Sequence, residues 1–126
     1  VLTSRGLGDV YKRQIGNKAY DLASLIDDVR FKTSNSLKVK VYNYYLKTNK
    51  KIDADKFKND FEILSVLRNL KIIGIFMRLA ERDKKTKYLK LIPYAWKMID
   101  NRLAQNKDLN SLKLLLASNF PKFISK

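Results

Sequence analysis

From Lys18 onward, apolar residues recur at intervals of three and four positions, which is the spacing of one face of an α-helix. No stretch alternates apolar and polar residues between turn signals, so the pattern predicts no β-strand. The expected fold class is therefore all-α, with about five to six helices. The predicted helices span about 18–30, 37–48, 53–82, 93–105 and 110–119, with a short helical segment at 88–92.

Residues that start and stop helices lie at the ends of these segments. The polar cluster T-S-N-S at 33–36 breaks the chain and can cap the second helix, and Asp53 can cap the third. Pro93 suits the first turn of the next helix, where no backbone N–H is required. Pro121 prevents the last helix from continuing.

The third predicted helix is apolar on nearly every side, so we expect it to be buried on most of its surface. Gly74 lies in its middle and costs about 1 kcal/mol relative to alanine. Close approach of a neighbouring helix would explain that glycine. The apolar positions that leave no wide polar face are Ile63, Val66, Leu67, Leu70, Ile72, Ile73, Phe76, Met77, Leu79 and Ala80.

Four polar residues interrupt this helix, namely Arg68, Asn69, Lys71 and Arg78. The three cations fall within about 80° of one another on a helical wheel, on the side that Phe57, Phe61 and Leu64 occupy earlier in the helix. Burying an unpaired charge costs several kcal/mol, so each cation must meet a carboxylate, a ligand or a water-filled cleft. Internal ion pairs to Asp27, Asp28 or Glu81 are preferred for Lys71 and Arg78, whereas both interpretations stay open for Arg68.

The aspartates of the first predicted helix have structural interpretations. Asp21 lies in its first turn, where the helix dipole favours a carboxylate that can accept backbone N–H bonds. Asp27 and Asp28 are adjacent, so their side chains diverge by about 100° and do not form a catalytic or metal-binding dyad. No catalytic residue and no metal ligand is predicted in this chain.

Residues 1–14 differ from the rest of the chain. They begin without Met, hold two of the four glycines and show neither helical nor strand periodicity. The stretch resembles translated adaptor read-through at the start of metagenomic open reading frames, so we expect it to be non-native and disordered. A natural flexible N-terminus is the alternative. With the first interpretation, residues 15–126 form one domain that is the C-terminal fragment of a longer protein.

The amino-acid composition excludes several kinds of catalytic and metal-binding site. The chain has no cysteine and no histidine, which excludes disulfides, thiolate or imidazole zinc sites, and catalysis by either residue type. The longest apolar run, at 72–77, is far below the roughly 20 residues of a membrane span. A cytoplasmic location and no contact with a membrane are expected.

The net charge of +15 raises the alternative of a small basic helical module that binds nucleic acid. Residues 1–14 contribute three basic residues against one acidic, which leaves +13 in the remainder. That remainder is rich in Lys rather than Arg, whose planar fork matches phosphate oxygens. The lysines are spread over every helix, so a solvated surface is the preferred interpretation and nucleic acid is not the expected partner.

A third interpretation is a helical domain that binds a protein partner through Tyr42, Tyr44 and Tyr45. Aromatic residues are enriched at interfaces. Three tyrosines within one turn are more often the core and rim of a helical bundle, and that reading is preferred.

Several blocks carry a family resemblance. Residues 16–25, G-N-K-A-Y-D-L-A-S-L, resemble the G-P-x-x-Y-D-L-A-S-L stretch of the aminoglycoside phosphotransferase family. The blocks L-R-N-L-K-I-I-G-I-F at 67–76, R-L-A-E-R-D at 78–83, and Tyr88-Leu89 through Ile92-Pro93 to Trp96 agree with it. The likeness covers essentially 15–121 and is greatest to the bacterial kinases that phosphorylate N-acetylmuramate or N-acetylglucosamine at the anomeric hydroxyl.

The resemblance implies a protein-kinase-like fold, of which this chain is the helical C-terminal lobe. The parent would use ATP and Mg²⁺ to phosphorylate an amino sugar, in cell-wall sugar recycling or in antibiotic modification. The family's catalytic loop and its magnesium-binding D-F-Q-D-A segment are absent from the sequence, so the chain alone is expected to be inactive and to bind neither cofactor. An N-terminal lobe would cover an apolar face of this chain.

The resemblance also assigns roles to individual residues. Asp21 matches the family's aspartate that supports the catalytic loop by accepting its backbone N–H groups. Arg68 and Asn69, with Lys71 and Arg78, are the candidates for lining the sugar-acceptor side. Asn17 stands where proline is usual, and Leu67 replaces a common polar residue, which puts an acceptor contact there in doubt.

Overall fold

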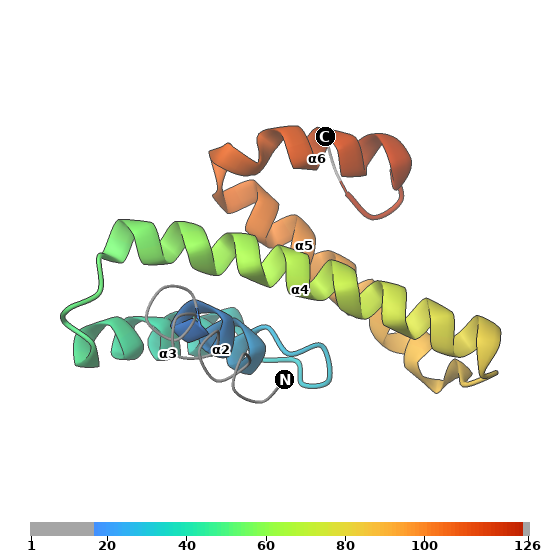
Figure 1. Ribbon diagram of the computed structural model, residues 1–126, viewed down its shortest axis with the longest axis horizontal. Helices are drawn as coiled ribbons and strands as arrows, with labels where there is room; N and C mark the ends of the chain where they lie inside the picture. Colours follow the sequence, from blue (N-terminus) through green and yellow to red (C-terminus); the bar gives the residue numbers. More distant parts are fainter. Residues whose placement is uncertain (1–16, 125–126) are drawn as a thin grey trace, which may run out of the picture.

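The computed structural model describes residues 17–124, and these residues form helices without a β-strand (Figure 1). The all-α prediction is therefore confirmed for the part of the chain that the structure describes. The leader prediction for residues 1–14 lies outside it, as does Gly16. The elements are α2 (Asn17–Ile26), α3 (Asn35–Thr48), α4 (Ala54–Arg82), the 3₁₀ helix η1 (Thr86–Leu91), α5 (Ile92–Gln105), the 3₁₀ helix η2 (Lys107–Leu109) and α6 (Asn110–Asn119).

The predicted helix boundaries agree with these elements wherever a capping residue marks them. The Ser34 hydroxyl accepts a hydrogen bond from the Leu37 backbone N–H at 3.2 Å and caps α3. The Asp53 carboxylate accepts from two backbone N–H groups in the first turn of α4. Pro93 lies in the first turn of α5, and Pro121 follows α6.

The first helix is shorter than predicted, because it ends at Ile26 rather than near Arg30. The Asp28 carboxylate accepts a hydrogen bond from the Arg30 backbone N–H at 2.9 Å, and the Asp28 carbonyl accepts from the Phe31 N–H. These local bonds give the backbone an alternative to another helical turn. The segment predicted at 88–92 is the 3₁₀ helix η1, which leads directly into α5.

The long helix α4 is the axis against which the other helices pack (Figure 1). Helix α2 lies along the first half of α4, and α5 makes the most extensive contact with it. One apolar cluster joins α2 and α4 through Ala19, Leu22, Ala23, Ile26, Phe57 and Phe61. A second joins α4, α5, α6 and the C-terminal residues through Val66, Trp96, Ile99, Leu103, Leu116, Ala117 and Ile124.

The expectation that α4 is buried on most sides is wrong for its second half. All its buried residues lie between Phe57 and Asn69, and none lies between 70 and 82. Leu67, Ile75 and Met77 are exposed. The sequence pattern is uniformly apolar, but α2 and α3 accompany only the first half of the helix in the described part of the chain (Figure 1).

The explanation offered for Gly74 is also wrong. A Cβ built on Gly74 would meet no atom of the described chain within 4 Å, so no neighbouring helix requires a glycine there. We therefore expect Gly74→Ala to raise the free energy of unfolding by about 0.5–1 kcal/mol, because alanine costs less backbone entropy in a helix. Urea unfolding followed by circular dichroism measures this change. A loss of stability in this chain would show that Gly74 has a packing role.

The tyrosines of α3 divide between core and surface, as the preferred interpretation predicted. The ring of Tyr42 lies 5.8 Å from that of Phe57, and the ring of Tyr45 stacks on Phe57 at 5.6 Å. Tyr44 is 69% exposed and is the only one of the three that points to solvent. No patch of three exposed tyrosines exists to receive a partner.

Candidate functional site

Asn69 is the most unusual of the predicted site residues. It is 1% exposed, and neither its amide nitrogen nor its amide oxygen has a hydrogen-bond partner among the described residues. A buried polar group without a partner costs about 1–3 kcal/mol. The helix thus buries an amide that the described chain does not satisfy.

Arg68 precedes Asn69 and is half-buried. Its Nη1 atom is shielded from solvent and has no hydrogen-bond partner among residues 17–124. Arg68 lies near Asp28, since its positive charge contributes to lowering the pKa of that carboxyl, although the side-chain hydrogen bond from Arg30 is the main cause. Of the possible ion-pair partners of Arg68, Asp28 instead pairs with Arg30 at 2.9 Å.

Lys71 and Arg78 are exposed, which corrects the prediction that they form internal ion pairs. Asp27 and Asp28 bind other cations, and Glu81 is itself exposed, with no ion pair between 17 and 124. The side of the helical wheel that carries Lys71 and Arg78 also carries buried Phe57. It opens to solvent further along α4, where no described helix covers that side.

Asp21 also differs from its prediction. Helix α2 begins at Asn17, so Asp21 lies just beyond the first turn, and its side chain is exposed. A carboxylate at that position is available to groups outside the described chain, which a supporting role for a catalytic loop requires. Arg68 and Asn69 are neighbours on α4 and both carry buried polar atoms, while Asp21, Lys71 and Arg78 are exposed.

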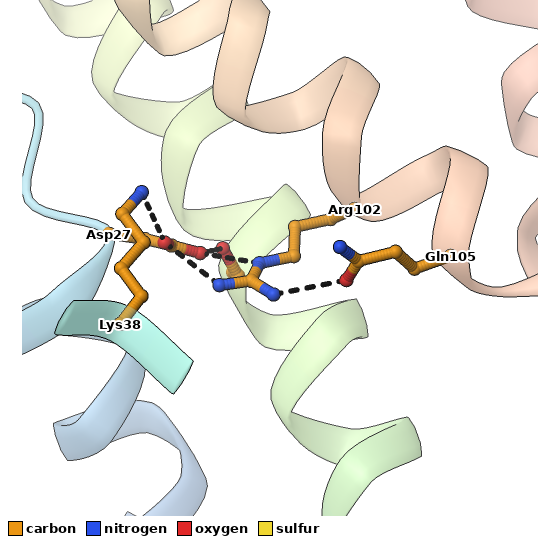
Figure 2. A network of polar contacts seen from close by, with 5 residues as sticks. Asp27, Lys38, Arg102 and Gln105 are labelled. Carbon is orange, nitrogen blue, oxygen red and sulfur yellow. Dashed lines mark hydrogen bonds and ion pairs between the residues drawn. The ribbon is translucent and has the colours of Figure 1, made fainter. Parts of the chain in front are cut away.

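The structure also assembles a polar network around Asp27 (Figure 2). The Asp27 carboxylate is 1% exposed and accepts hydrogen bonds from Lys38 Nζ at 3.0 Å and from Arg102 Nε at 2.8 Å and Nη2 at 3.0 Å. Ser65 also donates its hydroxyl to this carboxylate. One side chain following α2 therefore binds donors from α3, α4 and α5.

The charges in this network hold Asp27 ionised. Burial alone would raise the pKa of Asp27, but the hydrogen bonds and charges of Arg102, with Ser65 and Lys38, outweigh it and lower the pKa below its ordinary value. The guanidinium of Arg102 lies 4.8 Å from the centre of the Phe61 ring and donates from Nη1 to the Gln105 side chain at 3.1 Å. The Arg102 side chain is thus held by hydrogen bonds to Asp27 and Gln105 and by its contact with the Phe61 ring.

A groove of about 360 Å³ opens beside this network, between α3 and α5. Its charged and amide lining consists of Asp27, Asn35, Lys38, Asn101, Arg102 and Gln105, and its apolar lining of Val39, Met98 and Ala104. This volume lies at the small end of the range for ligand pockets.

Sequence reasoning considered Asp27 but gave it the wrong partners. A usable signal was present, because Asp27 continues the apolar series 19, 22, 23, 26 of α2, and Arg102 falls between Ile99 and Leu103 in α5. Lys38 likewise starts the series 38, 41, 42, 45 of α3. A charge on an apolar stripe must meet an opposite charge in the core, which predicts that each of these three residues has a buried ionic partner but does not select which one.

Two further side chains with buried polar atoms lie near Arg102. Tyr42 OH and Glu62 Oε2 are both buried without a hydrogen-bond partner in the described residues. Burial and the nearby charge of Glu62 raise the pKa of Tyr42 to about 12. Burial also raises the pKa of Glu62, against the opposing charges of Lys58 and Arg102.

Nothing in the described range gathers three His, Cys, Asp or Glu side chains into a group able to hold a metal ion. Among the same residues, no helix is at once long and apolar enough to cross a membrane. The buried polar groups of the described residues thus include Arg68 and Asn69, the Asp27 network, and Tyr42 with Glu62.

Over part of its length, the chain is similar to kinases of amino sugars. It is 30% identical over 95 residues to the N-acetylmuramate/N-acetylglucosamine kinase of Caulobacter vibrioides, a match that covers 75% of this chain and 26% of that enzyme. It is 39% identical over 57 residues to the enzyme of the same name from Pseudomonas aeruginosa, covering 45% of this chain and 17% of that enzyme. No protein-family model matches the chain. The chain thus spans about a quarter or less of these relatives.

Proposed function

We propose that this chain is the helical, acceptor-side part of an ATP-dependent phosphotransferase whose substrate is an amino sugar. The observation that carries the proposal is the match of three quarters of the chain to an N-acetylmuramate/N-acetylglucosamine kinase. The aminoglycoside phosphotransferase family is the finer assignment within this proposal, and it rests on the sequence blocks at 16–25, 67–76 and 78–83.

In this proposal the chain binds and orients the sugar, and phosphoryl transfer uses groups outside it. The sequence contains no histidine and no D-F-Q-D-A segment, which are parts of the family's catalytic loop and magnesium site. ATP and Mg²⁺ are therefore proposed as cofactors of the larger protein, where the metal would neutralise charge on the transferred phosphoryl group. The chain by itself is proposed to be inactive.

Arg68 and Asn69 are the proposed sugar contacts, and Asp21 the proposed support of the catalytic loop. Arg68 Nη1 and the amide of Asn69 have no hydrogen-bond partner among residues 17–124, which supports the first assignment, because such polar atoms are available to a ligand or to a neighbouring segment. The exposure of Lys71 and Arg78 makes them weaker candidates for the same role. The exposed carboxylate of Asp21 suits contact with a segment outside the described residues.

The test begins with the reading frame that precedes residue 15 in the source DNA. Codons for H-G-D and D-F-Q-D-A there would support the proposal, and a frame without them would overturn it. The encoded protein, expressed whole, should transfer the γ-phosphoryl group of ATP to N-acetylmuramate or N-acetylglucosamine. A coupled assay of ADP release measures the rate for each sugar and for an aminoglycoside.

Variants of that whole protein test the proposed contacts. We expect Arg68→Gln and Asn69→Ala to raise the KM for the sugar about tenfold or more, since a hydrogen bond to a charged or buried group contributes about 1.5–3 kcal/mol. Arg82→Gln is the control, because Arg82 is an exposed arginine on the same helix. An unchanged KM for both variants would remove Arg68 and Asn69 from the acceptor site.

Stability separates a binding role of Asn69 from a structural one. Asn69→Ala should leave the unfolding free energy of this chain unchanged or higher, because the amide is buried without a partner among the described residues. A loss of several kcal/mol would instead mean that the amide stabilises the fold directly.

A further inference from the structure

The groove between the start of α3 and the end of α5 carries an excess of positive charge. Lys38 and Arg102 line it and share the single carboxylate of Asp27. Lys32 does not line the groove, but its ammonium and that of Lys38 each lie 5.7 Å from the centre of the Tyr94 ring. Glu62 acts on Arg102 from α4 but does not line the groove. Within the lining itself, two cations face one carboxylate.

The cations also retain donors beyond those that Asp27 uses. The Lys38 ammonium carries three N–H groups, one of which is directed to Asp27. The Arg102 guanidinium carries five, of which two go to Asp27 and one to Gln105. Both side chains are mostly buried, at 10% and 15% exposure, so their charges are weakly screened by water. The hydrogen bonds to Asp27 and Gln105 hold both side chains in position (Figure 2).

The neutral residues of the groove add hydrogen-bonding capacity for a hydroxylated molecule. The amides of Asn35, Asn101 and Gln105 can both donate and accept hydrogen bonds. Asn35 also begins α3, a helix of 14 residues whose N-terminal dipole favours a negative group. A volume of about 360 Å³ admits more than a bare anion.

We propose that this groove binds the phosphate or carboxylate group of a small hydroxylated metabolite, with Lys38 and Arg102 contacting the anion and the amides of Asn35, Asn101 and Gln105 contacting its hydroxyl groups. Asp27 acts as the positioning residue, because its carboxylate holds Lys38 and Arg102 in place. Its negative charge acts on the ligand only together with the positive charges of these two residues. The inference does not rest on the proposed kinase function, because it uses only Asp27, which follows α2, and residues of α3 and α5.

The experiment titrates the ¹⁵N-labelled chain with three probes at constant ionic strength. They are inorganic phosphate, glucose 6-phosphate and gluconate, and sodium chloride is the reference. We expect saturable shifts of the Asn35, Lys38 and Asn101 amide signals with at least one probe. Tighter binding of glucose 6-phosphate than of inorganic phosphate indicates a phosphorylated metabolite, and binding of gluconate indicates a carboxylate. Shifts no larger than those in chloride would overturn the proposal.

Two matched variants assign the binding to the groove. Asn101→Asp places a negative charge in the lining and should weaken the affinity at least tenfold. Asn110→Asp makes the same charge change at an exposed position outside the lining and should leave it unchanged. Equal effects of the two variants would mean that only net charge matters, which overturns the proposal. Asn101 is exposed on α5, and its side chain makes no hydrogen bond to another described residue, so Asn101→Asp is expected to fold.

A second basic groove of the chain provides a further control. It is lined by Lys18, Lys47, Lys50 and Lys51, which are all exposed, together with Thr48, Asn49 and Ile52. The double substitution Lys50→Gln and Lys51→Gln should leave the affinity for the three probes unchanged. Loss of binding in that variant would place the anion at the exposed lysines and overturn the assignment to the groove beside Asp27.

Discussion

Asp27→Asn is expected to lower the free energy of unfolding by about 3–5 kcal/mol, because it leaves two buried cations without their carboxylate. The side chain of Asp27 is 1% exposed and binds Lys38, Arg102 and Ser65. Asparagine keeps the shape of the side chain but removes its charge and replaces one acceptor oxygen by a donor. Most of the loss is therefore electrostatic rather than a packing defect.

Urea unfolding of the wild-type chain and the variant, followed by circular dichroism, measures this loss. Asp83→Asn is the matched control, since Asp83 pairs with Arg82 in the exposed pair at the end of α4. Exposed ion pairs contribute about 0–1 kcal/mol, so the control should change little. Equal effects of the two variants would show that the Asp27 network contributes no more than a surface pair.

Asp27→Asn should also change how the free energy of unfolding depends on pH in acid. The pKa of Asp27 is lowered in the folded chain from its ordinary value of 3.8, so its contribution to stability is fully present above that value. It is lost as the pH falls below 3.8 through the folded pKa. The stability difference between the wild-type chain and Asp27→Asn should accordingly be constant from pH 5 to pH 7 and shrink below pH 3.8. A difference independent of pH down to pH 2 would contradict the ionised state of Asp27.

Phe61→Ala is expected to destabilise the chain by about 3–5 kcal/mol, the range for a large aromatic side chain removed from a core. Phe61 is 1% exposed, and its ring lies 5.2 Å from the ring of Tyr42. It also lies 4.8 Å beneath the guanidinium of Arg102. The alanine variant therefore loses apolar burial, aromatic contact and the surface on which Arg102 rests.

Thermal and urea unfolding measure the effect, with Phe31→Ala as the control. Phe31 is 67% exposed in the segment between α2 and α3, so its removal should change the stability by no more than about 0.5 kcal/mol. Phe61→Leu refills most of the volume and should recover a large part of the loss. A loss in Phe61→Ala no larger than that in Phe31→Ala would mean that α2 and α4 are not packed as described.

Helix boundaries could be predicted from sequence because local chemistry determines them. Ser34 and Asp53 cap α3 and α4 with their own side chains, and both were identified from residue type and position. The end of α2 was missed for a related reason. The apolar spacing runs through Val29, while the Asp28 carboxylate binds the Arg30 backbone and stops the helix at Ile26.

Burial along α4 could not be predicted, because it depends on which helices lie beside it. Leu67 and Val66 are both apolar neighbours in sequence, yet the first is exposed and the second fully buried. Lys71 and Arg78 lie within about 60° of buried Phe57 on the helical wheel but are exposed, because α2 packs only along the first half of α4 (Figure 1). The pattern of one helix contains no information on the length of the helices that cover it.

The candidate site was predicted in part. Arg68 and Asn69 were identified because they are polar residues in an apolar helix, and both carry buried polar atoms that have no partner in the described part of the chain. The pairing of Asp27 with Arg102 joins residues 75 positions apart, and sequence spacing alone does not select that partner over Arg68. Only the fold brings the two elements together.

The sharing of Asp27 among three donors has a consequence for how the chain unfolds. Each of α3, α4 and α5 contributes one donor to the same carboxylate, so the free energy with which one of these helices docks depends on the presence of the other two. Substitutions at Lys38 and Arg102 should therefore be non-additive. Detaching one helix weakens the attachment of the rest, which favours loss of the structure in a single cooperative step.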